Sequence, residues 1–534
     1  MEPTRQTLGV VTEGTFNAGL TVRLSAGCTT ESLRVGSFVV LEGERNRYFS
    51  LITDMRLRVT DAGLAATPPF DSSSFVRKAL ANSHTYATVE VRPSLMLEDA
   101  HDAEGAGPGP VRNIPMHFAM LREATEVDFD LVFGQESDTR FALGTPPTMD
   151  IKIPIDLKEL VTRSNGVFGQ SGTGKSVLTR LLLFGIIKSD VASVLVFDMH
   201  GEYARQLPGE PKIQGMVDLF GSSRVIVYTL ESGHGHRDLA FGLNQIEPED
   251  IELLAGELNL TGTYGATTHQ LWERFRERWL QRLLAMSSEE LEDFCTETGT
   301  HQGALGALKQ KLAVLTRRKY ILEHAETSAI DDLLANLQRG KHVILQFGSY
   351  QSFLDYMLVA NIVTRRIHQR YTDQVNAQSN QSAVTREDPR HLVVVLEEAH
   401  KFLTPEASRQ SIFGTIAREM RKYSVTLLIV DQRPSGIDPE VMSQIGTRIT
   451  GLLTDQRDID AVLTGVSDRN QMRGMLASLR PKQECLILGH AIPMPIMLRT
   501  REYDPIELKR EIKPAGTEAL GASWLRGQLN GDED

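Results

Sequence analysis

The sequence predicts an α/β fold: a mostly parallel sheet flanked by helices, preceded by a small β-rich unit and interrupted by a helical insertion. Three observations support this fold class. From about residue 151 onward, apolar runs typical of buried strands alternate with helix-like segments, which favours a parallel sheet. A glycine-rich loop lies between the first of these strands and a helix-like run. Residues 1–150 instead contain short, closely spaced strand-like runs.

The β-rich unit is predicted over residues 1–150 as a small barrel or a sandwich. Its strand-like runs are apolar or alternate in polarity, and turn residues such as Gly14, Gly19 and Gly36 separate them. The runs are 21–24, 37–41, 48–52, 85–91 and 140–143. Residues 99–110 have the composition of a loop or linker.

Strands of the parallel sheet are predicted on both sides of the helical insertion. They are 166–168, 193–197, 224–228, 342–347, 391–396, 425–430, 448–453 and 484–488. The insertion covers about residues 246–340, where Trp272, Phe275, Trp279 and Leu283 recur at helical spacing. Plain helix packing explains that stripe. Ser287 and Glu290 fit a capping box at the start of another helix.

The most informative stretch is Gly169 to Ser176, which reads G-Q-S-G-T-G-K-S and fits G-x-x-x-x-G-K-[ST] in full. Glycines let the backbone curl so that several N–H groups point at one anion, and the following helix adds its positive end. We therefore expect an ATP-phosphate cradle here. Lys175 would reach the β- and γ-phosphates, and the Ser176 hydroxyl would hold Mg²⁺. The predicted ATP-binding residues are Gly169, Gln170, Ser171, Gly172, Thr173, Gly174, Lys175, Ser176 and Val177.

Two carboxylates follow the buried-strand run at 391–396 directly, at Glu397 and Glu398. Open α/β sheets bind ligands at the carboxyl ends of their strands. A P-loop ATPase needs one acid beside the magnesium ion and one to polarise the attacking water. We assign Glu397 to the magnesium side and Glu398 as the catalytic base. The simpler interpretation, a solvated strand end, is common for an isolated Glu-Glu pair.

A third polar cluster follows the buried-strand run at 425–430. Gln432 is placed to sense the γ-phosphate and orient water. Just upstream, Arg418 and Arg421 lie near a predicted helix end, where an arginine could act on a neighbouring subunit's nucleotide as an arginine finger. The alternative is that both are solvated helix charges with i,i+3 partners.

Acidic residues also follow the predicted strand at 193–197. Asp198 and Glu202 lie on its outgoing loop, where an acid could help to orient water or magnesium. The alternative is a turn with an Asx-type hydrogen bond at Asp198. We favour a functional role for Asp198 and assign none to Glu202.

Composition indicates an ordinary globular protein. The chain has 534 residues, enough for roughly three structural units. It is 41% hydrophobic and 24% charged, and its net charge is −12, so nucleic-acid contacts would need local basic patches. Cys28, Cys295 and Cys485 lie far apart, which predicts neither a disulfide framework nor a zinc site. With no predicted signal peptide or membrane span, we expect a cytoplasmic protein without a membrane partner.

Taken together, these motifs resemble the HerA branch of the HerA–FtsK group of ring-forming DNA translocases. The matching segments, in order, are G-Q-S-G-T-G-K-S, V-F-D-M-H-G-E-Y, V-V-L-E-E-A-H-K-F-L, A-R-E-M-R-K-Y and L-L-I-V-D-Q-R-P-S. The resemblance covers nearly the whole chain. The phosphate loop is generic, whereas H-G-E-Y, E-E-A-H and Q-R-P-S together are much more specific.

The resemblance implies a RecA-like P-loop core with an N-terminal β-barrel and a helical insertion. The implied domains are a barrel over 1–150, core parts over 151–245 and 341–502, the insertion over 246–340 and a C-terminal arm over 503–534 that braces the adjacent subunit.

Catalytic residues carry over by position. Lys175 and Ser176 would bind ATP and Mg²⁺, Glu398 would be the catalytic acidic residue and Gln432 the sensor. Arg421, with Arg418 as the second candidate, would be a finger acting in trans. Many P-loop ATPases have Asp where this chain has Glu397, which adds one methylene and allows a water between carboxylate and metal.

The resemblance also implies partners. Family members form homohexamers and move double-stranded DNA through the ring, commonly with a NurA-type nuclease in DNA-end resection, or in some bacteria with an anti-phage defence effector. Two alternatives stay open: an ATP-gated scaffold that activates an effector enzyme, and a secretion or conjugation ATPase. Candidate DNA-phosphate contacts are the basic clusters at 317–319 and 365–370, although such runs are usually solvated faces.

Overall fold

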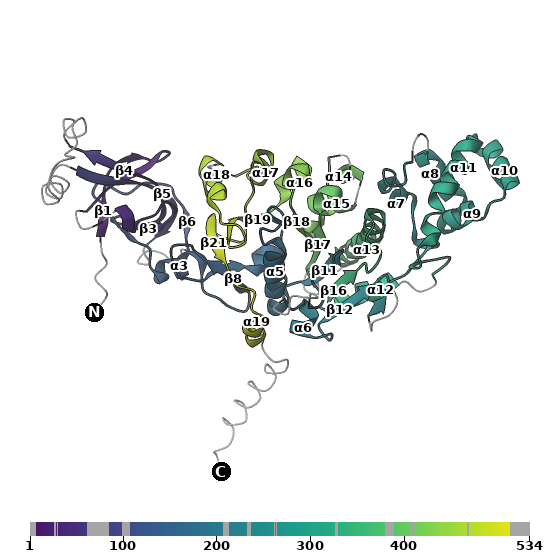
Figure 1. Ribbon diagram of the computed structural model, residues 1–534, viewed down its shortest axis with the longest axis horizontal. Helices are drawn as coiled ribbons and strands as arrows, with labels where there is room; N and C mark the ends of the chain where they lie inside the picture. Colours follow the sequence, from purple (N-terminus) through teal and green to yellow (C-terminus); the bar gives the residue numbers. More distant parts are fainter. Residues whose placement is uncertain are drawn as a thin grey trace, which may run out of the picture. The chain divides into compact units, whose positions relative to one another are not determined.

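The computed structural model describes residues 7–25, 28, 30–60, 85–98, 107–206, 213–231, 236–260, 262, 264–325, 329–379, 389–405, 407–410, 412–466 and 469–512. The chain divides into two compact units (Figure 1). The first comprises residues 1–156, 449–454 and 465–501. The second comprises residues 157–448, 455–464 and 502–534.

A β-barrel forms the N-terminal part of the first unit. The strands are β1 (Thr7–Thr15), β2 (Gly19–Leu24), β3 (Phe38–Glu42), β4 (Asn46–Val59), β5 (Thr85–Glu98), β6 (Gly109–Pro110) and β7 (Met120–Glu123). They run in the order β2-β1-β7-β3-β4-β5-β6, and an additional β2–β5 pairing closes the ring. Alternate residues point inward, so Val22, Val39 and Val89 are fully buried. Of the two predicted forms, the barrel is confirmed.

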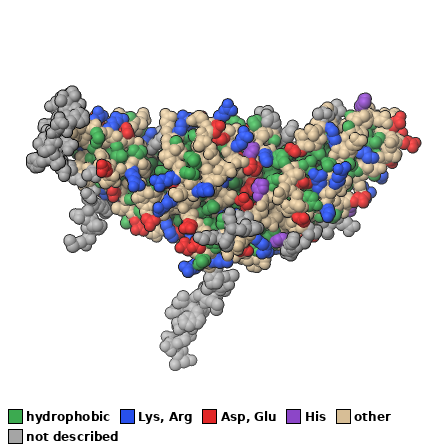
Figure 2. All heavy atoms as spheres, viewed as in Figure 1, with side chains coloured by type: hydrophobic (Ala, Val, Ile, Leu, Met, Phe, Trp, Pro, Cys, Tyr) green, Lys and Arg blue, Asp and Glu red, His purple; other side chains and the backbone are tan. Residues whose placement is uncertain are grey.

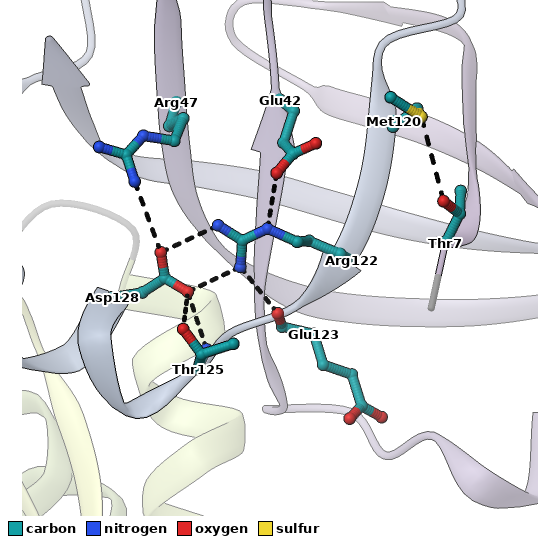
Figure 3. Close-up of polar contacts among 8 residues, drawn as sticks. All are labelled: Thr7, Glu42, Arg47, Met120, Arg122, Glu123, Thr125 and Asp128. Atoms are coloured by element: carbon teal, nitrogen blue, oxygen red, sulfur yellow. Dashed lines mark hydrogen bonds and ion pairs between the residues drawn. The ribbon is translucent and has the colours of Figure 1, made fainter. Parts of the chain in front are cut away.

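Helix α3 (Glu126–Phe133) packs against the barrel through aromatic rings and through ion pairs of Asp128 with Arg122 and Arg47. The Phe129 ring lies 5.3 Å from the rings of both Phe38 and Phe49. Beside these rings, the Arg122 guanidinium donates to both carboxylate oxygens of Asp128, at 2.6 and 2.9 Å (Figure 3). Burial alone would raise the pKa of Asp128, but the hydrogen bonds from Arg122 and Thr125 outweigh it and lower the pKa.

The buried ion pair predicts a stability defect. Asp128→Asn should lower the free energy of unfolding of the barrel by about 3 kcal/mol, because it leaves a buried guanidinium without its bidentate partner. Calorimetric unfolding of the full chain would measure this, with Glu126→Gln on the exposed side of the same helix as the control. Since the folded-state pKa of Asp128 is lowered, the difference should be present above pH ~4 and shrink as the pH falls further. An unchanged transition would contradict the assigned role.

Four antiparallel strands outside the barrel belong to the same unit. They are β8 (Arg140–Thr145), β9 (Ile153–Asp156), β20 (Glu484–Gly489) and β21 (Ile496–Thr500), in the order β20-β21-β8-β9. Helix α18 (Arg469–Ser478) precedes β20. The predicted strand at 140–143 therefore exists, but its placement in the barrel was wrong. Its hydrogen bonds go to β9 and β21, and alternation of polarity does not reveal which sheet a strand joins.

The second unit contains the parallel sheet. Its strands are β10 (Asn165–Phe168), β11 (Ser193–Asp198), β12 (Val225–Thr229), β13 (Arg237–Asp238), β16 (His342–Gln346), β17 (Leu392–Glu397) and β18 (Val425–Asp431). Their order is β13-β12-β16-β11-β17-β18-β10, and every pairing between these neighbours is parallel. All residues of β11, β17 and β18 are buried, as expected for parallel strands covered on both faces. The predicted strand at 448–453 appears as β19 (Thr447–Thr450).

Helices connect these strands. They are α4 (Leu157–Val161), α5 (Lys175–Ser189), α6 (Met216–Phe220), α12 (Ala329–Gln338), α13 (Phe353–Ser379), α14 (Ala407–Gln410), α15 (Ile412–Glu419), α16 (Pro439–Gln444) and α17 (Gln456–Val462). Helix α5 contacts β10 and β11, and α15 contacts β18. Helix α13, with 27 residues, is the longest of these helices.

The predicted helical insertion is confirmed as a set of short helices. They are α7 (Pro248–Leu253), α8 (Tyr264–Phe275), α9 (Trp279–Ala285), α10 (Ser288–Thr298) and α11 (Gln302–Leu312), and a two-residue pairing of β14 (Phe241–Gly242) with β15 (Ile321–Leu322) accompanies them. The Trp279 indole is buried and donates to the Ile246 carbonyl at 2.8 Å. The capping box at Ser287 and Glu290 is present in both directions. The aromatic stripe is divided, since Arg276 (φ 49°) breaks the helix between α8 and α9.

The segment predicted as a C-terminal arm begins as a helix. Helix α19 (Pro505–Glu511) has the Asp504 side chain as its N-cap. Its Leu508 is buried, and Glu511 pairs with Lys188 of α5 at 2.9 Å. These residues therefore pack on their own chain. Residues 513–534, and 99–106 of the predicted linker, lie outside the described residues.

Candidate active site

The predicted phosphate cradle lies between β10 and α5. Gly172 (φ 74°) and Gly174 (φ 98°) adopt left-handed backbone conformations that side chains disfavour. A Cβ at Gly172 would meet nothing within 4 Å, so its φ angle, rather than a lack of space, calls for glycine. Helix α5 begins at Lys175, and its first N–H groups face the end of the loop. This arrangement suits an anion such as a nucleotide phosphate.

Lys175 lies among several acids. Its Nζ donates to the Gln170 carbonyl at 2.9 Å, which folds the side chain back over the loop. Burial lowers the pKa of Lys175, while four carboxylates act in the opposite direction. These carboxylates belong to Glu202, Glu397, Glu398 and Asp431. Acids at three different strand ends are thus brought to one lysine, and two of them, Glu397 and Glu398, were predicted site residues.

Glu397 ends β17 and is 8% exposed. Its Oε1 accepts a hydrogen bond of 2.7 Å from the Tyr203 hydroxyl. Its Oε2 is buried and has no hydrogen-bond partner among the described residues. Burial raises the pKa of Glu397 to about 8, and neighbouring carboxylates add to the shift while the Tyr203 hydrogen bond opposes it. A buried oxygen without a partner fits the water shell of Mg²⁺, an ion that proteins hold through one or two carboxylates and substrate phosphates.

Glu398 and Gln432 meet across the ends of β17 and β18. The Gln432 side-chain amide lies 3.3 Å from each carboxylate oxygen of Glu398. Glu398 has a left-handed backbone (φ 51°), an unusual conformation for glutamate and one that clusters at functional sites. Its side chain is 27% exposed, so water can reach it. The proposed catalytic base and the proposed sensor are therefore neighbours.

A further pair, His400 and Asp431, received no role in the sequence analysis. His400 Nδ1 lies 3.0 Å from both carboxylate oxygens of the fully buried Asp431, and 3.8 Å from Glu398. Hydrogen bonding to Asp431 raises the pKa of His400, although burial opposes the shift. The available signal was the position of Asp431 directly before Gln432 and of His400 two residues after Glu398.

Asp198 is engaged by its own turn. Its Oδ1 accepts from the Glu202 N–H at 2.7 Å and its Oδ2 from the Tyr203 N–H at 3.1 Å. The carboxylate is fully buried, and burial raises its pKa despite these bonds. These contacts fit the turn interpretation, and a direct catalytic role for Asp198 stays a prediction. The Glu202 carboxylate lies 4.0 Å from Arg180.

The two candidate finger arginines differ in their surroundings. Arg418, at the end of α15, donates from Nη2 to the Ser408 carbonyl at 2.9 Å. Its Nη1 is buried without a hydrogen-bond partner in the described part of the chain. Arg421 lies on the 3₁₀ turn Met420–Tyr423 and is exposed. Exposure makes Arg421 the more accessible of the two to another subunit.

The suggested basic clusters are partly used inside the chain. Arg318 pairs with Asp355 at 2.9 Å, and Arg365 pairs with Asp250 at 2.9 Å and also with Glu247. The prediction that these two arginines contact DNA phosphates is therefore wrong, because each already forms an ion pair with a buried carboxylate. Figure 2 shows lysine and arginine side chains interspersed with acidic ones on the visible face.

A glycine-rich cradle followed by a helix, a lysine facing it and carboxylates at the neighbouring strand ends define a P-loop ATPase. Comparison with known proteins shows which P-loop ATPases this chain is similar to. Residues 141–367 match the family described as "Helicase HerA, central domain". The DNA double-strand break repair helicase HerA of Pyrococcus furiosus is 22% identical over 403 residues, covering 70% of this chain and 71% of that protein.

Two further comparisons cover more of the other protein. HerA of Sulfolobus acidocaldarius is 21% identical over 514 residues, covering 92% of this chain and 94% of that protein. Among solved structures, VirB4 of Thermoanaerobacter pseudethanolicus has a TM-score of 0.45 and 13% identity, covering 70% of this chain and 100% of that one. The chain is thus similar to HerA helicases over most of its length, and its site is that of a P-loop ATPase. In the described part of the chain, no helix combines the length and apolarity needed to cross a membrane.

The site predicts two separable defects. Lys175→Ala should abolish ATP hydrolysis and weaken nucleotide binding, because the Lys175 ammonium is expected to contact the phosphates. Glu398→Gln should lower hydrolysis by at least ~100-fold and leave binding intact, because a base acts on the water only. Phosphate release and binding of a fluorescent nucleotide would measure the two effects. Lys188→Ala, at the other end of α5, is the matched control, and near-normal turnover in both site variants would overturn the assignment.

Proposed function

We propose that this chain is an ATP-driven translocase that acts on double-stranded DNA as a homohexameric ring with a RecA-like core. One observation carries the proposal. The similarity to a protein named as a DNA double-strand break repair helicase extends over 92% of this chain, and so includes both the barrel and the ATPase core. We further propose a companion enzyme, either a NurA-type nuclease in DNA-end resection or an effector in anti-phage defence.

The proposed chemistry is phosphoryl transfer from ATP to water. The backbone N–H groups of residues 169–176 and the Lys175 ammonium bind the phosphates. Ser176 and Glu397 would hold Mg²⁺, which neutralises charge that develops on the phosphate oxygens. Glu398 accepts the proton of the attacking water, and the Gln432 amide orients that water, since the two side chains lie 3.3 Å apart. The hydrogen bond between His400 and Asp431 fixes the neighbouring strand end.

Strand geometry supports an arginine finger in trans. Arg421 precedes β18, whereas Gln432 follows it. The strand has 7 residues. At about 3.3 Å per residue, its two ends lie roughly 20 Å apart, much farther than an arginine side chain extends. Arg421 therefore faces away from the nucleotide of its own chain, and a second copy of the chain would supply the finger.

The first test is ATP hydrolysis with and without linear double-stranded DNA, at low and moderate salt. We expect strong stimulation that fades as salt rises, because a motor that grips phosphates releases counterions when it binds. The Glu398→Gln protein controls for contaminating ATPases. Salt-independent, unstimulated turnover would contradict the DNA motor and favour an ATP-gated scaffold that activates an effector enzyme.

The second test addresses the ring. Arg421→Ala should lower turnover by roughly 10³-fold, in line with other arginine fingers. Mixing it with Lys175→Ala protein should restore part of the activity, because mixed rings contain sites with an intact loop and an intact neighbouring arginine. Lys422→Ala, the exposed neighbour in sequence, is the control. Loss of turnover without recovery in mixed rings of verified composition would count against the finger in trans.

A further inference from the structure

We infer that Tyr203 is a positioning residue for Glu397, and that the turn 198–203 orients the Tyr203 hydroxyl toward the Glu397 carboxylate. The inference rests on the proposed magnesium role of Glu397 and deepens it. The Tyr203 hydroxyl donates to Glu397 Oε1 at 2.7 Å. The remaining oxygen, Oε2, is the buried atom without a hydrogen-bond partner among the described residues.

The turn is built to hold Tyr203 in one place. Both oxygens of Asp198 accept N–H groups of the turn, from Glu202 at 2.7 Å and from Tyr203 at 3.1 Å. Gly201 has φ 71°, which lets the chain reverse within so few residues. The Tyr203 carbonyl accepts from the Met216 N–H at 2.8 Å, so both backbone groups of the tyrosine are fixed. Asp198 thereby acts on the site through Tyr203.

The same turn is attached to the phosphate-binding helix. Arg180 of α5 is 2% exposed and donates to the Glu202 carbonyl from Nε at 3.2 Å and from Nη2 at 2.8 Å. Its guanidinium also lies 5.8 Å from the centre of the Tyr203 ring. The Tyr203 ring is itself fully buried. One turn thus connects β11, the first half of α5 and the end of β17.

The length of the glutamate side chain at position 397 explains why a positioning residue is needed. A glutamate has one more rotatable bond than the aspartate found in many P-loop ATPases, so its carboxylate can occupy more positions. A hydrogen bond from a rigid, buried phenol to Oε1 removes that freedom and leaves Oε2 as the oxygen presented to the metal side. Partners that orient a metal-binding group in this way typically change metal affinity by about 10–100-fold when they are removed.

The experiment is a Mg²⁺ titration of nucleotide binding by the full-length chain, with a fluorescent, non-hydrolysable ATP analogue followed by anisotropy. Tyr203→Phe should raise the Mg²⁺ concentration for half-maximal enhancement of binding by about 10–100-fold. Affinity for the analogue in EDTA should stay unchanged, because the phosphate loop is intact. An unchanged Mg²⁺ requirement in a folded variant would overturn the inference, and so would an equal loss of affinity with and without Mg²⁺.

Tyr356→Phe is the matched control. Tyr356 is also fully buried and contacts the same residue, but its hydroxyl donates to the Glu397 backbone carbonyl at 3.3 Å rather than to the carboxylate. Removing this hydroxyl should leave the Mg²⁺ requirement unchanged. An equal shift in both variants would mean that any lost buried hydroxyl disturbs β17, which would overturn a specific role for Tyr203.

A double-mutant cycle tests the pairing itself. Glu397→Asp shortens the side chain so that it no longer reaches the phenol. Adding Tyr203→Phe to Glu397→Asp should then shift the Mg²⁺ requirement less than about twofold, whereas additive effects would contradict the pairing. If Tyr203→Phe does not fold, Asp198→Asn is the second variant. It weakens the turn, so it should raise the Mg²⁺ requirement in the same direction, and no change would count against the inference.

Failure of the inference and failure of the proposed function give different results. If Glu397→Ala leaves the Mg²⁺ requirement unchanged, the magnesium role of Glu397 is wrong and the inference falls with it. If Glu397→Ala raises the requirement and Tyr203→Phe does not, only the positioning role of Tyr203 is wrong. Neither measurement involves DNA, so the translocase proposal is tested separately.

Discussion

The active site depends on the parallel register of three neighbouring strands. Phe168 at the end of β10 lies opposite Asp431 of β18, and Glu397 at the end of β17 lies opposite Val430. Because all three strands end at one edge of the sheet, the residues that follow them share one small volume. The phosphate loop, the two glutamates and Gln432 therefore meet without a long loop to gather them.

This convergence concentrates negative charge at a partly buried place. Four carboxylates act on the pKa of Lys175, and burial raises the pKa of Glu397 to about 8. The arrangement is costly for folding, since buried like charges repel and the left-handed backbone of Glu398 adds strain. Asp431 is stabilised by His400 and by backbone N–H groups, whereas Glu397 keeps one oxygen without a partner among the described residues. Such a site favours a cation and the groups that accompany it.

The sequence was sufficient for features that depend on local patterns. Strand ends marked by Glu397, Glu398 and Gln432 are adjacent because buried apolar runs of parallel strands stop where polar residues begin. Side-chain contacts between residues distant in sequence could not be predicted. Nothing local shows that Arg365 pairs with Asp250, or that Tyr203 points at Glu397, 194 positions away. The pattern at 140–143 likewise fixed a strand but not its sheet.

Strand β18 carries candidate functional residues at both of its ends. Its carboxyl end carries Asp431 and Gln432 beside the phosphate loop, and the turn before its amino end carries the exposed Arg421. A fully buried strand is stiff, so the two ends cannot move independently. In a ring in which Arg421 reaches the next nucleotide, the strand would join the water-orienting group of one site to the finger of its neighbour. In such a ring, the strand would couple neighbouring sites without a separate signalling element.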